Sequence, residues 1–264
     1  MTNRLGIIGG GALAEALVQG WLSEKLLAPG EVVVSHPRLE RRRYWQETYG
    51  VAVSSENRVA AAASEGVLVA VKPHQFSQIA PALRHAQPQA VLVSVLAGVA
   101  LVTLEQAVPE AAWVRAMPNA PVRVRAGITA VAWGQQVNEE QKAWVERLFR
   151  AVGQVVTVPE TYMNAVTALA GSGPAYVAVL VEGLIDGGVL VGLPRALATQ
   201  LAVQTVAGTV ALLQQQDITP AELKAQVMSP AGTTAAGLLC LESQGVRGLL
   251  MQTVQAAYQR AQTL

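Results

Sequence analysis

Small hydroxyl residues gather near the end of the chain, in the segment QVMSPAGTTAAGLLCLE at 226–242. Ser229, Thr233 and Thr234 surround Pro230 and Gly232, directly ahead of a run with helical character. No histidine or carboxylate stands among these hydroxyls, so a site built here has very little acid–base machinery. The chemistry of such a site therefore depends on what the rest of the chain supplies.

A glycine loop near the N-terminus can hold a cofactor. In GIIGGGALAEALVQG, Gly9, Gly11 and Ala14 stand in G-x-G-x-x-A register, between an expected strand and an expected helix. Gly9 permits a tight turn, Gly11 lets the backbone approach a pyrophosphate, and Ala14 allows close helix–strand packing. The helix start adds free N–H groups and a positive dipole end. The pattern predicts dinucleotide binding; the alternative is a glycine turn needed only for packing.

The end of the second expected strand indicates which dinucleotide binds. NAD enzymes usually place Asp or Glu there to hold the ribose hydroxyls, but this strand ends in VVVSHPRLERRR, with Ser35 at that position. A hydroxyl and a nearby guanidinium can bind a 2′-phosphate that a carboxylate would repel. We therefore expect NADPH to be preferred over NADH, with Arg38 on the phosphate. The alternative for Arg41, Arg42 and Arg43 is a solvated helix face.

Two further strand ends are expected to line the nicotinamide side of the cleft, because ligands of open α/β sheets lie beyond the carboxyl ends of the strands. VKPHQ (71–75) follows an expected strand at 67–71, and LAGV (96–99) follows another at 90–95. RAMPNAP (115–121) fits a loop closing over the same place. Lys72 can be catalytic or can donate to ribose oxygens, and the sequence leaves both roles open.

The first 158 residues have the rhythm of an α/β fold. A helix at 11–25 follows the first strand, at 4–9, and further strands are expected at 31–35, 67–71, 90–95 and 111–116. GITAVAW and GQVVTV extend the sheet near its edge, with a helix at 138–151 between them. Runs this apolar predict a mainly parallel sheet covered by helices on both faces.

After Pro159 the strands stop and helices follow one another. We expect them at about 160–171, 174–191, 194–214, 219–227 and 233–262. Thr219 and Glu222 form a capping-box pattern at the start of the fourth. The sequence thus divides near residue 158 into a dinucleotide-binding domain (1–158) and an all-helical domain (159–264).

Charge and hydrophobicity bear on the partners of the chain. Its 264 residues carry 19 basic and 18 acidic side chains, which gives no footprint for nucleic acid or an anionic membrane. Only 14% of residues are charged and 52% are hydrophobic, so we expect much surface to be buried between subunits. The uncharged segments 163–181 and 196–216 are long enough to span a bilayer, but their polar residues favour helices in a subunit interface.

Cysteine and histidine usage suggests neither a disulfide framework nor a metal site. The single Cys240, together with an N-terminus lacking a secretory pattern, fits a cytoplasmic protein. Cys240 is expected to be buried and inert in the middle of a helix. His36, His74 and His85 are too scattered to ligate a metal.

Seven segments, in this order, resemble the pyrroline-5-carboxylate reductase family: IGGGALAEAL, AVKPHQF, VSVLAGV, RAMPNAP, ALAGSGPAY, DGGVLVGLPRALA and LKAQVMSPAGTTAAGLLCLE. The resemblance covers nearly the whole chain, and the last segment matches the family signature. It implies an N-terminal Rossmann domain and an all-helical C-terminal dimerisation domain. It also implies homodimers that can assemble into a larger ring, and NAD(P)H-dependent reduction of 1-pyrroline-5-carboxylate to L-proline.

Carried over position by position, the resemblance implies two sets of contacts. Those to the cofactor come from Ile8, Gly9, Gly10, Gly11, Ala12, Leu13, Ser35, His36, Pro37, Asn57, Ala70, Val71, Lys72, Pro73 and Ala97. Those to the substrate come from Ser229, Gly232, Thr233, Thr234 and, in a loop that varies, Asp217.

Three positions depart from the family pattern. His36 stands where a second small hydroxyl is common, which affects the expected 2′-phosphate contacts. Met228 stands where a small residue is usual, and Ala231 replaces a frequent glycine. Ala231 permits the turn only if its φ is negative.

The implied reaction explains why so little acid–base machinery suffices. Hydride transfer to a C=N carbon needs alignment and an electrophilic imine more than a positioned base, since the cofactor carries the hard chemistry. We expect Thr234 to hydrogen-bond the ring nitrogen as the catalytic residue. The backbone N–H groups from Gly232 to Thr234 are expected to bind the substrate carboxylate, and Ser229 and Thr233 to cap the helix as well.

Two rival functions stay open on the sequence. The same site with a larger pocket would reduce a six-membered cyclic imine carboxylate. An NADP(H)-binding module without catalysis would use its helical half only for assembly. The intact SPAGTT segment argues against the second rival, because a pure sensor has no use for a carboxylate pocket.

Overall fold

The computed structural model of the protein describes residues 3–263, which fall into two compact units. The first contains the chain up to Ser172 together with the residues from Ala257 onward, and the second contains Gly173–Ala256. The last strand ends at Thr157, beside the position where the sequence changes rhythm, whereas the compact units divide later, inside a helix.

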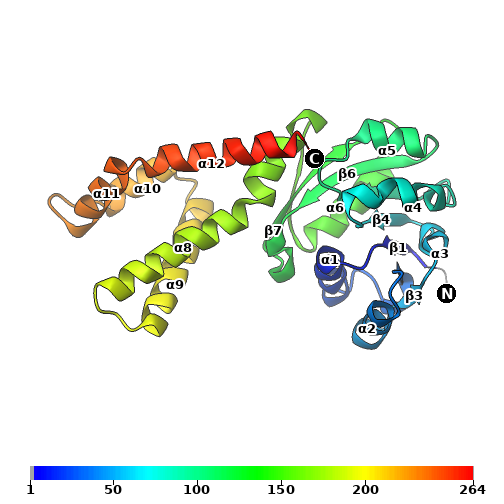
Figure 1. Ribbon diagram of the computed structural model, residues 1–264, viewed down its shortest axis with the longest axis horizontal. Helices are drawn as coiled ribbons and strands as arrows, with labels where there is room; N and C mark the ends of the chain where they lie inside the picture. The colour runs from blue at the N-terminus through cyan, green and yellow to red at the C-terminus, as the bar shows by residue number, and fades with distance from the viewer. Residues whose placement is uncertain (1–2, 264) are drawn as a thin grey trace. The chain divides into compact units, whose positions relative to one another are not determined.

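An eight-stranded sheet forms the centre of the first unit, in the order β3-β2-β1-β4-β5-β6-β7-β8 (Figure 1). Its strands are β1 (Leu5–Ile8), β2 (Val32–Ser35), β3 (Ala52–Ser54), β4 (Gly66–Val69), β5 (Val91–Ser94), β6 (Ala112–Pro118), β7 (Gly127–Trp133) and β8 (Gly153–Thr157). All neighbours are parallel except β6 and β7. The predicted doubly wound, mainly parallel sheet is confirmed.

Helices cover both faces of this sheet, as predicted. They are α1 (Ala12–Ser23), α2 (Leu39–Tyr49), α3 (Asn57–Ala61), α4 (Phe76–Leu83), α5 (Leu101–Ala107) and α6 (Glu139–Arg150). Side chains of α1, α2 and α6 share one core with Ile7, while those of α3, α4 and α5 share another with Ile8. Because side chains alternate along a strand, consecutive isoleucines of β1 enter opposite cores, and both are fully buried.

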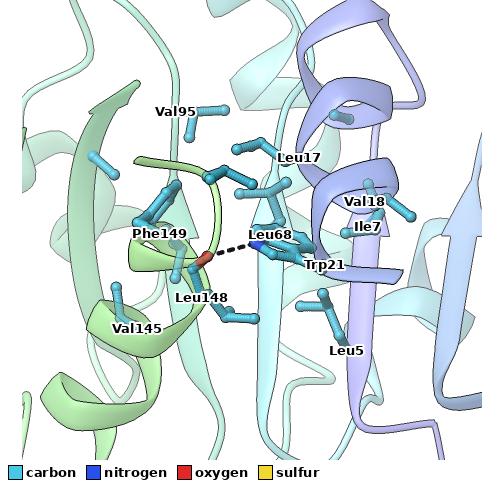
Figure 2. Close-up of a cluster of buried hydrophobic side chains, with 14 of the residues drawn as sticks. Leu5, Ile7, Leu17, Val18, Trp21, Leu68, Val95, Val145, Leu148 and Phe149 are labelled. Atoms are coloured by element: carbon cyan, nitrogen blue, oxygen red, sulfur yellow. Dashed lines mark hydrogen bonds between the residues drawn. The ribbon is translucent and has the colours of Figure 1, made fainter. Parts of the chain in front are cut away.

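Trp21 fixes helix α1 against the sheet and α6 (Figure 2). Its indole N–H donates to the carbonyl of Leu148 at 2.7 Å, and its ring meets Phe149 edge-on with centroids 6.4 Å apart. The large buried ring thus has its one polar atom satisfied. Since α1 begins directly after the glycine loop, this packing also anchors the loop.

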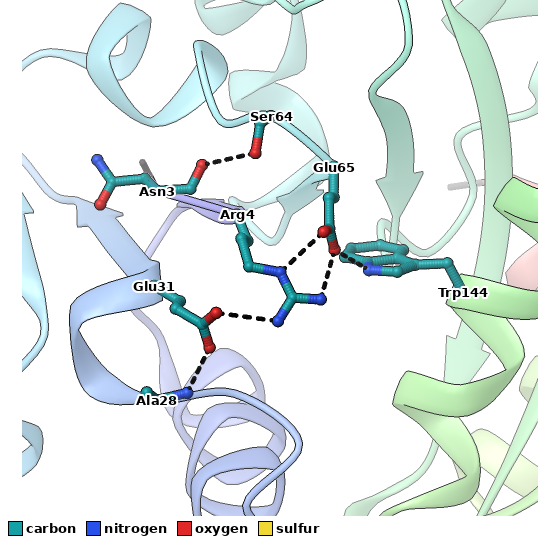
Figure 3. Close-up of polar contacts among 7 residues, drawn as sticks. All are labelled: Asn3, Arg4, Ala28, Glu31, Ser64, Glu65 and Trp144. Atoms are coloured by element: carbon teal, nitrogen blue, oxygen red, sulfur yellow. Dashed lines mark hydrogen bonds and ion pairs between the residues drawn. The ribbon is translucent and has the colours of Figure 1, made fainter. Parts of the chain in front are cut away.

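The Arg4 cluster ties the amino ends of β1, β2 and β4 to one another and to the middle of helix α6 (Figure 3). The Arg4 guanidinium donates to Glu65, before β4, at 2.8 and 2.9 Å, and to Glu31, before β2, at 3.0 Å. Trp144 of α6 donates its indole N–H to the same Glu65 carboxylate at 2.6 Å. Parallel strands have their amino ends on the same side of the sheet. The cluster therefore lies at the amino ends of the strands, opposite to the glycine loop at their carboxyl ends.

The helical part of the chain consists of α7 (Met163–Val166), a π-helical turn (Thr167–Gly171), α8 (Gly173–Leu190), α9 (Arg195–Gln215), α10 (Pro220–Val227), α11 (Thr233–Ser243) and α12 (Val246–Ala261). Short 3₁₀ turns lie at Pro29–Glu31, Pro73–Gln75, Ala120–Val124 and Glu160–Tyr162. The Thr219 capping box is confirmed, with Glu222 N–H donating to the Thr219 hydroxyl at 3.2 Å.

Two helix predictions are wrong in their boundaries. The expected helices at 160–171 and 174–191 form one continuous helix, Glu160–Leu190. The expected single helix at 233–262 is broken at Gly245, whose φ of 65° lies in the left-handed region that glycine adopts without strain.

A π-helical turn lets the long helix pass through Pro174. Proline has no N–H, so the carbonyl of Ala170 loses its usual helical partner. The Asn119 side-chain amide donates to that carbonyl at 3.2 Å instead, and Ser172 N–H reaches back to Thr167 at 2.9 Å. Asn119 therefore replaces the bond that the sequence takes away.

Apolar side chains are widely exposed on the helices of the second unit. Val179 on α8 is 66% exposed and Leu239 on α11 is 71% exposed. Cys240 is exposed in the single chain, so the expectation that it is buried is wrong. Within residues 3–263, two helices are long and apolar enough to cross a membrane, Glu160–Leu190 and Arg195–Gln215.

Candidate functional site

The carboxyl ends of four strands lie in one row. Ile8 of β1 pairs in register with Ser35 on one side and Val69 on the other, and Val69 pairs with Ser94. The glycine loop and the loops after β2, β4 and β5 therefore all begin at the carboxyl ends of neighbouring strands. The strand order reverses between β1 and β4, which is where open α/β sheets bind ligands.

The three glycines of the loop meet different constraints. Gly9 has a φ of 99°, and a Cβ there would lie 2.6 Å from the carbonyl oxygen of Ala70. A Cβ on Gly10 would lie 2.4 Å from the indole nitrogen of Trp45. Gly11, the N-cap of α1, would meet nothing within 4 Å. Packing thus requires the first two glycines, while the third faces open space.

A pocket of about 600 Å³ opens beside this loop. It is lined by Gly10, Gly11, Ala12, Glu15, His36, Arg38, Glu40, Arg41 and Tyr44. The structure therefore brings together the glycine loop and the segment after β2, as the sequence reasoning required. Arg38, Arg41 and His36 bring hydrogen-bond donors to this pocket, and Glu15 and Glu40 bring carboxylates.

Ser35 and Asn57 hold each other beneath this region. The Ser35 hydroxyl donates to the side-chain oxygen of Asn57 at 2.8 Å, and Ser35 is only 1% exposed. The carbonyl of Ser35 accepts from Gly9 N–H at 3.2 Å. In the described part of the chain, neither of these two side chains lines the pocket. Their hydrogen bond instead supports the loops that do.

His36 presents one ring nitrogen to the fold and has the other left for the pocket. Its Nδ1 accepts from the backbone N–H of Arg38 at 3.1 Å. Burial lowers the pKa of His36 below its ordinary value, and the positive charges of Arg41 and Arg38 act in the same direction. The imidazole is therefore neutral at pH 7, with its proton on Nε2.

The arginines of this region have separate partners. Arg41 donates to the Gly10 carbonyl at 2.8 Å and pairs with Glu15. Arg42 donates to the carbonyls of His36 and Pro37, each at 2.8 Å. Among residues 3–263, no side-chain hydrogen bond or ion pair engages the guanidinium of Arg38, which remains available at the pocket.

The loops after β4 and β5 complete the row. Ala70 N–H donates to Ile8 at 2.8 Å, which joins this loop to the glycine loop. Lys72 and Pro73 are exposed, with Lys72 at the start of the 3₁₀ turn Pro73–Gln75. Ala97 is partly buried and precedes Gly98, whose φ is 77°.

The hydroxyl segment of the second unit surrounds the start of α11. Gly232 is the N-cap, and no side chain caps this helix, so the expectation that Ser229 and Thr233 cap it is wrong. A Cβ on Gly232 would lie 2.2 Å from the Ser229 hydroxyl, and Gly232 N–H donates to the Ser229 carbonyl at 3.1 Å. The N–H groups at Thr233 and Thr234 are left without a side-chain acceptor in the described structure.

Two residues near this segment have left-handed backbone. Ala231 has a φ of 53°, so the condition of a negative φ is not met, and the alanine takes up a left-handed turn. Asp217 has a φ of 50° and is exposed. Helix α10, about 12 Å long from its eight residues, stands between Asp217 and Ser229. Within residues 3–263, no three His, Cys, Asp or Glu side chains gather as a metal site would require.

Sequence reasoning missed Glu15, Tyr44 and the inward role of Arg41. A usable signal was present, because Arg41, Tyr44 and Trp45 are spaced i, i+3 and i+4 and so share one face of α2. On the sequence, a solvated helix face was the alternative for the arginines of α2, and Arg38 was the one expected to reach the ligand. The carboxylate of Glu15, one turn into α1, is what turns the face inward.

Comparison with known proteins gives consistent results for both parts of the chain. Residues 160–264 match a family described as pyrroline-5-carboxylate reductase dimerisation, and residues 4–98 match one described as NADP oxidoreductase coenzyme F420-dependent. A pyrroline-5-carboxylate reductase from Synechocystis is 47% identical over 264 residues, covering 100% of this chain and 99% of its own length. One from Mycobacterium leprae is 42% identical, covering 99% and 96%.

Solved structures show the same similarity. A pyrroline-5-carboxylate reductase from Coxiella burnetii has a TM-score of 0.91 at 32% identity, covering 100% of this chain and 98% of its own. A pyrroline carboxylate reductase from Plasmodium falciparum, solved with NADP bound, has a TM-score of 0.90 at 28% identity, covering 100% and 99%.

Proposed function

The chain belongs to the pyrroline-5-carboxylate reductase family and reduces 1-pyrroline-5-carboxylate to L-proline, and we propose that the glycine loop and the Ser229–Thr234 segment supply its two binding sites. The observation that carries the assignment of sites is the pocket beside Gly11. There, the backbone of Gly11 faces open space and the guanidinium of Arg38 has no ion-pair partner among the described residues. NADPH, when bound, supplies the hydride, so the protein has to bind, align and polarise.

On the cofactor side, we propose that the loop from Ile8 to Leu13 holds the pyrophosphate. Gly11 has free space above its Cα, and it caps a helix whose first N–H groups attract an anion. The adjoining loops contribute Ala70, Val71, Lys72, Pro73 and Ala97, at the edge where β4 and β5 end. Ser35, Pro37 and Asn57 act mainly through the backbone geometry that they support.

For the 2′-phosphate, we propose Arg38 and His36 as the ligands. The Arg38 guanidinium has no other engagement among the described residues, and the neutral His36 ring keeps an Nε2–H donor. His36 can therefore donate a hydrogen bond where a small hydroxyl is common in the family. This arrangement favours NADPH over NADH, in agreement with the NADP found in the Plasmodium falciparum enzyme.

On the substrate side, we propose that the start of α11 binds the carboxylate. The uncapped N–H groups of Thr233 and Thr234 and the absence of a side chain at Gly232 leave an anion-binding turn. Ser229 lines this turn, and Thr234 donates its hydroxyl to the ring nitrogen. Asp217 is a further substrate contact that we propose on the family pattern alone.

The assembly follows from the helical region. A family defined by its dimerisation matches residues 160–264, so the protein oligomerises through these helices. We propose a homodimer, which can build into a larger ring, working in the cytoplasm without a membrane or nucleic-acid partner. We also propose that the functional domain boundary lies near residue 158.

The test is an assay of purified protein with cyclic imine carboxylates of five- and six-membered rings, each with NADPH and NADH. The larger kcat/KM is expected for the five-membered ring with NADPH. A higher value for the six-membered ring would identify the other imine as the substrate. Cofactor binding with no turnover of either ring would leave only a binding module.

A further inference from the structure

We propose that Arg41 is a positioning residue for the pyrophosphate side of the cofactor site, serving NADPH and NADH alike, while Arg38, unlike Arg41, contributes to discriminating between them. The inference rests on the proposed cofactor site and assigns different roles to its two arginines, Arg38 and Arg41. Arg41 acts through two groups, the Glu15 carboxylate and the Gly10 carbonyl.

Glu15 places a negative charge on the wall of a pocket proposed to hold phosphates. It lies in the first turn of α1 and lines the pocket together with Gly11 and Ala12. Burial raises its pKa, but hydrogen bonds from Tyr44, Arg41 and Tyr49 outweigh burial, so the pKa of Glu15 is lowered overall. The carboxylate is therefore ionised at neutral pH and would repel a pyrophosphate if it were left uncompensated.

Arg41 supplies the compensating charge. Its terminal nitrogen pairs with one oxygen of Glu15, while the other oxygen accepts from Tyr44 at 2.5 Å and Tyr49 at 3.1 Å. The two tyrosines bring no net charge, so the guanidinium alone offsets the carboxylate. The Arg41 guanidinium lies over the ring of Tyr44, 4.5 Å from its centroid, which holds it in place.

Arg41 also orients the peptide between Gly10 and Gly11. The Gly10 carbonyl accepts from the Arg41 Nε at 2.8 Å and from the Trp45 indole at 3.3 Å, so it points toward α2. In a trans peptide the C=O and the following N–H point in opposite directions. The Gly11 N–H is thereby directed away from α2, as a phosphate-binding loop requires.

Both effects concern atoms that NADPH and NADH share. A direct 2′-phosphate ligand would instead affect NADPH only. The ratio of the affinities for NADPH and NADH therefore separates a positioning arginine from one that binds the 2′-phosphate. A general folding defect is also distinguishable, because removing the charge of Glu15 would not restore the affinity of a misfolded protein.

The experiment measures Kd for NADPH and for NADH by titration without substrate, for the full-length protein. Arg41→Gln is expected to weaken both cofactors by the same factor, about tenfold for a lost charge-assisted hydrogen bond. Arg38→Gln is expected to weaken NADPH by about tenfold and NADH by less than about twofold. Arg43→Gln, exposed on the same helix, is the matched control and is expected to leave both constants unchanged.

Two further variants test the route through Glu15. Adding Glu15→Gln to Arg41→Gln is expected to recover part of the lost affinity for both cofactors, since the repelling charge is gone. Arg41→Lys keeps the charge beside Glu15 but not the second donor to the Gly10 carbonyl, so it is expected to lose less affinity for both cofactors than Arg41→Gln does. A loss confined to NADPH in Arg41→Gln, no loss at all, or no recovery in the double variant overturns the proposal. Because no turnover is measured, these outcomes are independent of which imine the protein reduces.

Discussion

The left-handed backbone at Ala231 is a local strain beside the proposed carboxylate-binding turn. Such a φ costs an L-residue with a side chain about 1–2 kcal/mol, whereas glycine adopts it without this penalty. Ala231→Gly is therefore expected to raise the free energy of unfolding by about 0.5–1 kcal/mol after the extra chain entropy of glycine is subtracted. Urea denaturation followed by the helical signal in circular dichroism measures it, since the helical unit contains no tryptophan.

Ala235→Gly is the matched control, because Ala235 lies in the first turn of α11 with helical backbone. That substitution is expected to lower stability by about 0.5–1 kcal/mol. If both variants lose stability equally, the strain at Ala231 is refuted.

Thr234 is the residue on which the chemistry of the second site depends. Removing its hydroxyl takes away the proposed hydrogen bond to the ring nitrogen, which receives the electron pair of the C=N bond as hydride adds to the carbon. Thr234→Ala is expected to lower kcat by about tenfold or more and to leave the Kd of NADPH nearly unchanged. Thr234→Ser keeps a hydroxyl and is expected to restore most of kcat. An unchanged kcat in the alanine variant would remove Thr234 from the mechanism.

At this scale, the sequence predicts residues whose role follows from backbone geometry. Gly9 and Gly11 were predicted by spacing alone. The structure gives Gly9 a steric reason, because a Cβ there would lie 2.6 Å from the Ala70 carbonyl oxygen, whereas Gly11 faces open space beside the pocket. Roles that depend on a partner distant in sequence were not predictable. For Arg41 the sequence left a solvated position open as the alternative, because nothing near it in sequence reveals that it pairs with Glu15 on another helix. The missing cap at Gly232 likewise depends on the actual path of the Ser229–Thr233 turn.

The elements of the first unit are held at their amino ends by the Arg4 cluster, which makes their docking sensitive to acid. Burial raises the pKa of Glu65, but the bonds from Arg4 and Trp144 lower it overall, and the Ala28 backbone and Arg4 lower the pKa of Glu31. A carboxyl whose folded pKa is depressed stabilises the fold above its unfolded pKa and loses that contribution as pH falls through the folded value. The free energy of unfolding is therefore expected to decline once the pH drops below about 4.5.

Glu65→Gln tests this assignment. The variant is expected to be less stable at pH 7 and to show a shallower decline between about pH 5 and pH 3, because one linked proton is missing. Urea unfolding at several pH values gives both quantities. Glu110→Gln, at an exposed position, serves as the control and should keep the wild-type slope. An identical slope in Glu65→Gln would mean that other carboxyls govern the acid limb.

Elements with a strong repeating pattern were predicted from the sequence, and interruptions were not. Strands buried on both faces read as apolar runs, and β1, β2, β4 and β5 fall where those runs stand. The short edge strand β3 was not predicted, because one of its three residues is exposed and the other two are only partly buried. Pro174 was taken as a helix start, since the sequence does not show that Asn119 satisfies the carbonyl that proline leaves free. The helix expected at 233–262 runs through Gly245, where the structure breaks it.

For the whole molecule, the exposed apolar surface of the helical unit is the feature that a single chain cannot explain. Soluble monomers rarely expose large contiguous apolar patches, yet α8, α9, α11 and α12 all carry exposed leucine, valine or methionine. Residues 160–264 match a dimerisation family, which indicates that the helices of another subunit cover this surface. Membrane insertion of the two long apolar helices is the competing explanation.

Substitution within this surface separates the two explanations. Burying one such aliphatic side chain contributes about 1.5–3 kcal/mol, and a carboxylate in its place would also be desolvated. Val179→Glu and Leu239→Glu are expected to shift the oligomer toward monomer in analytical ultracentrifugation. Val102→Glu, on α5 of the first unit and 56% exposed, is the matched control and should leave assembly intact. Wild-type protein that stays in the membrane fraction until detergent is added, with both variants unchanged in mass, would favour the bilayer over a second subunit.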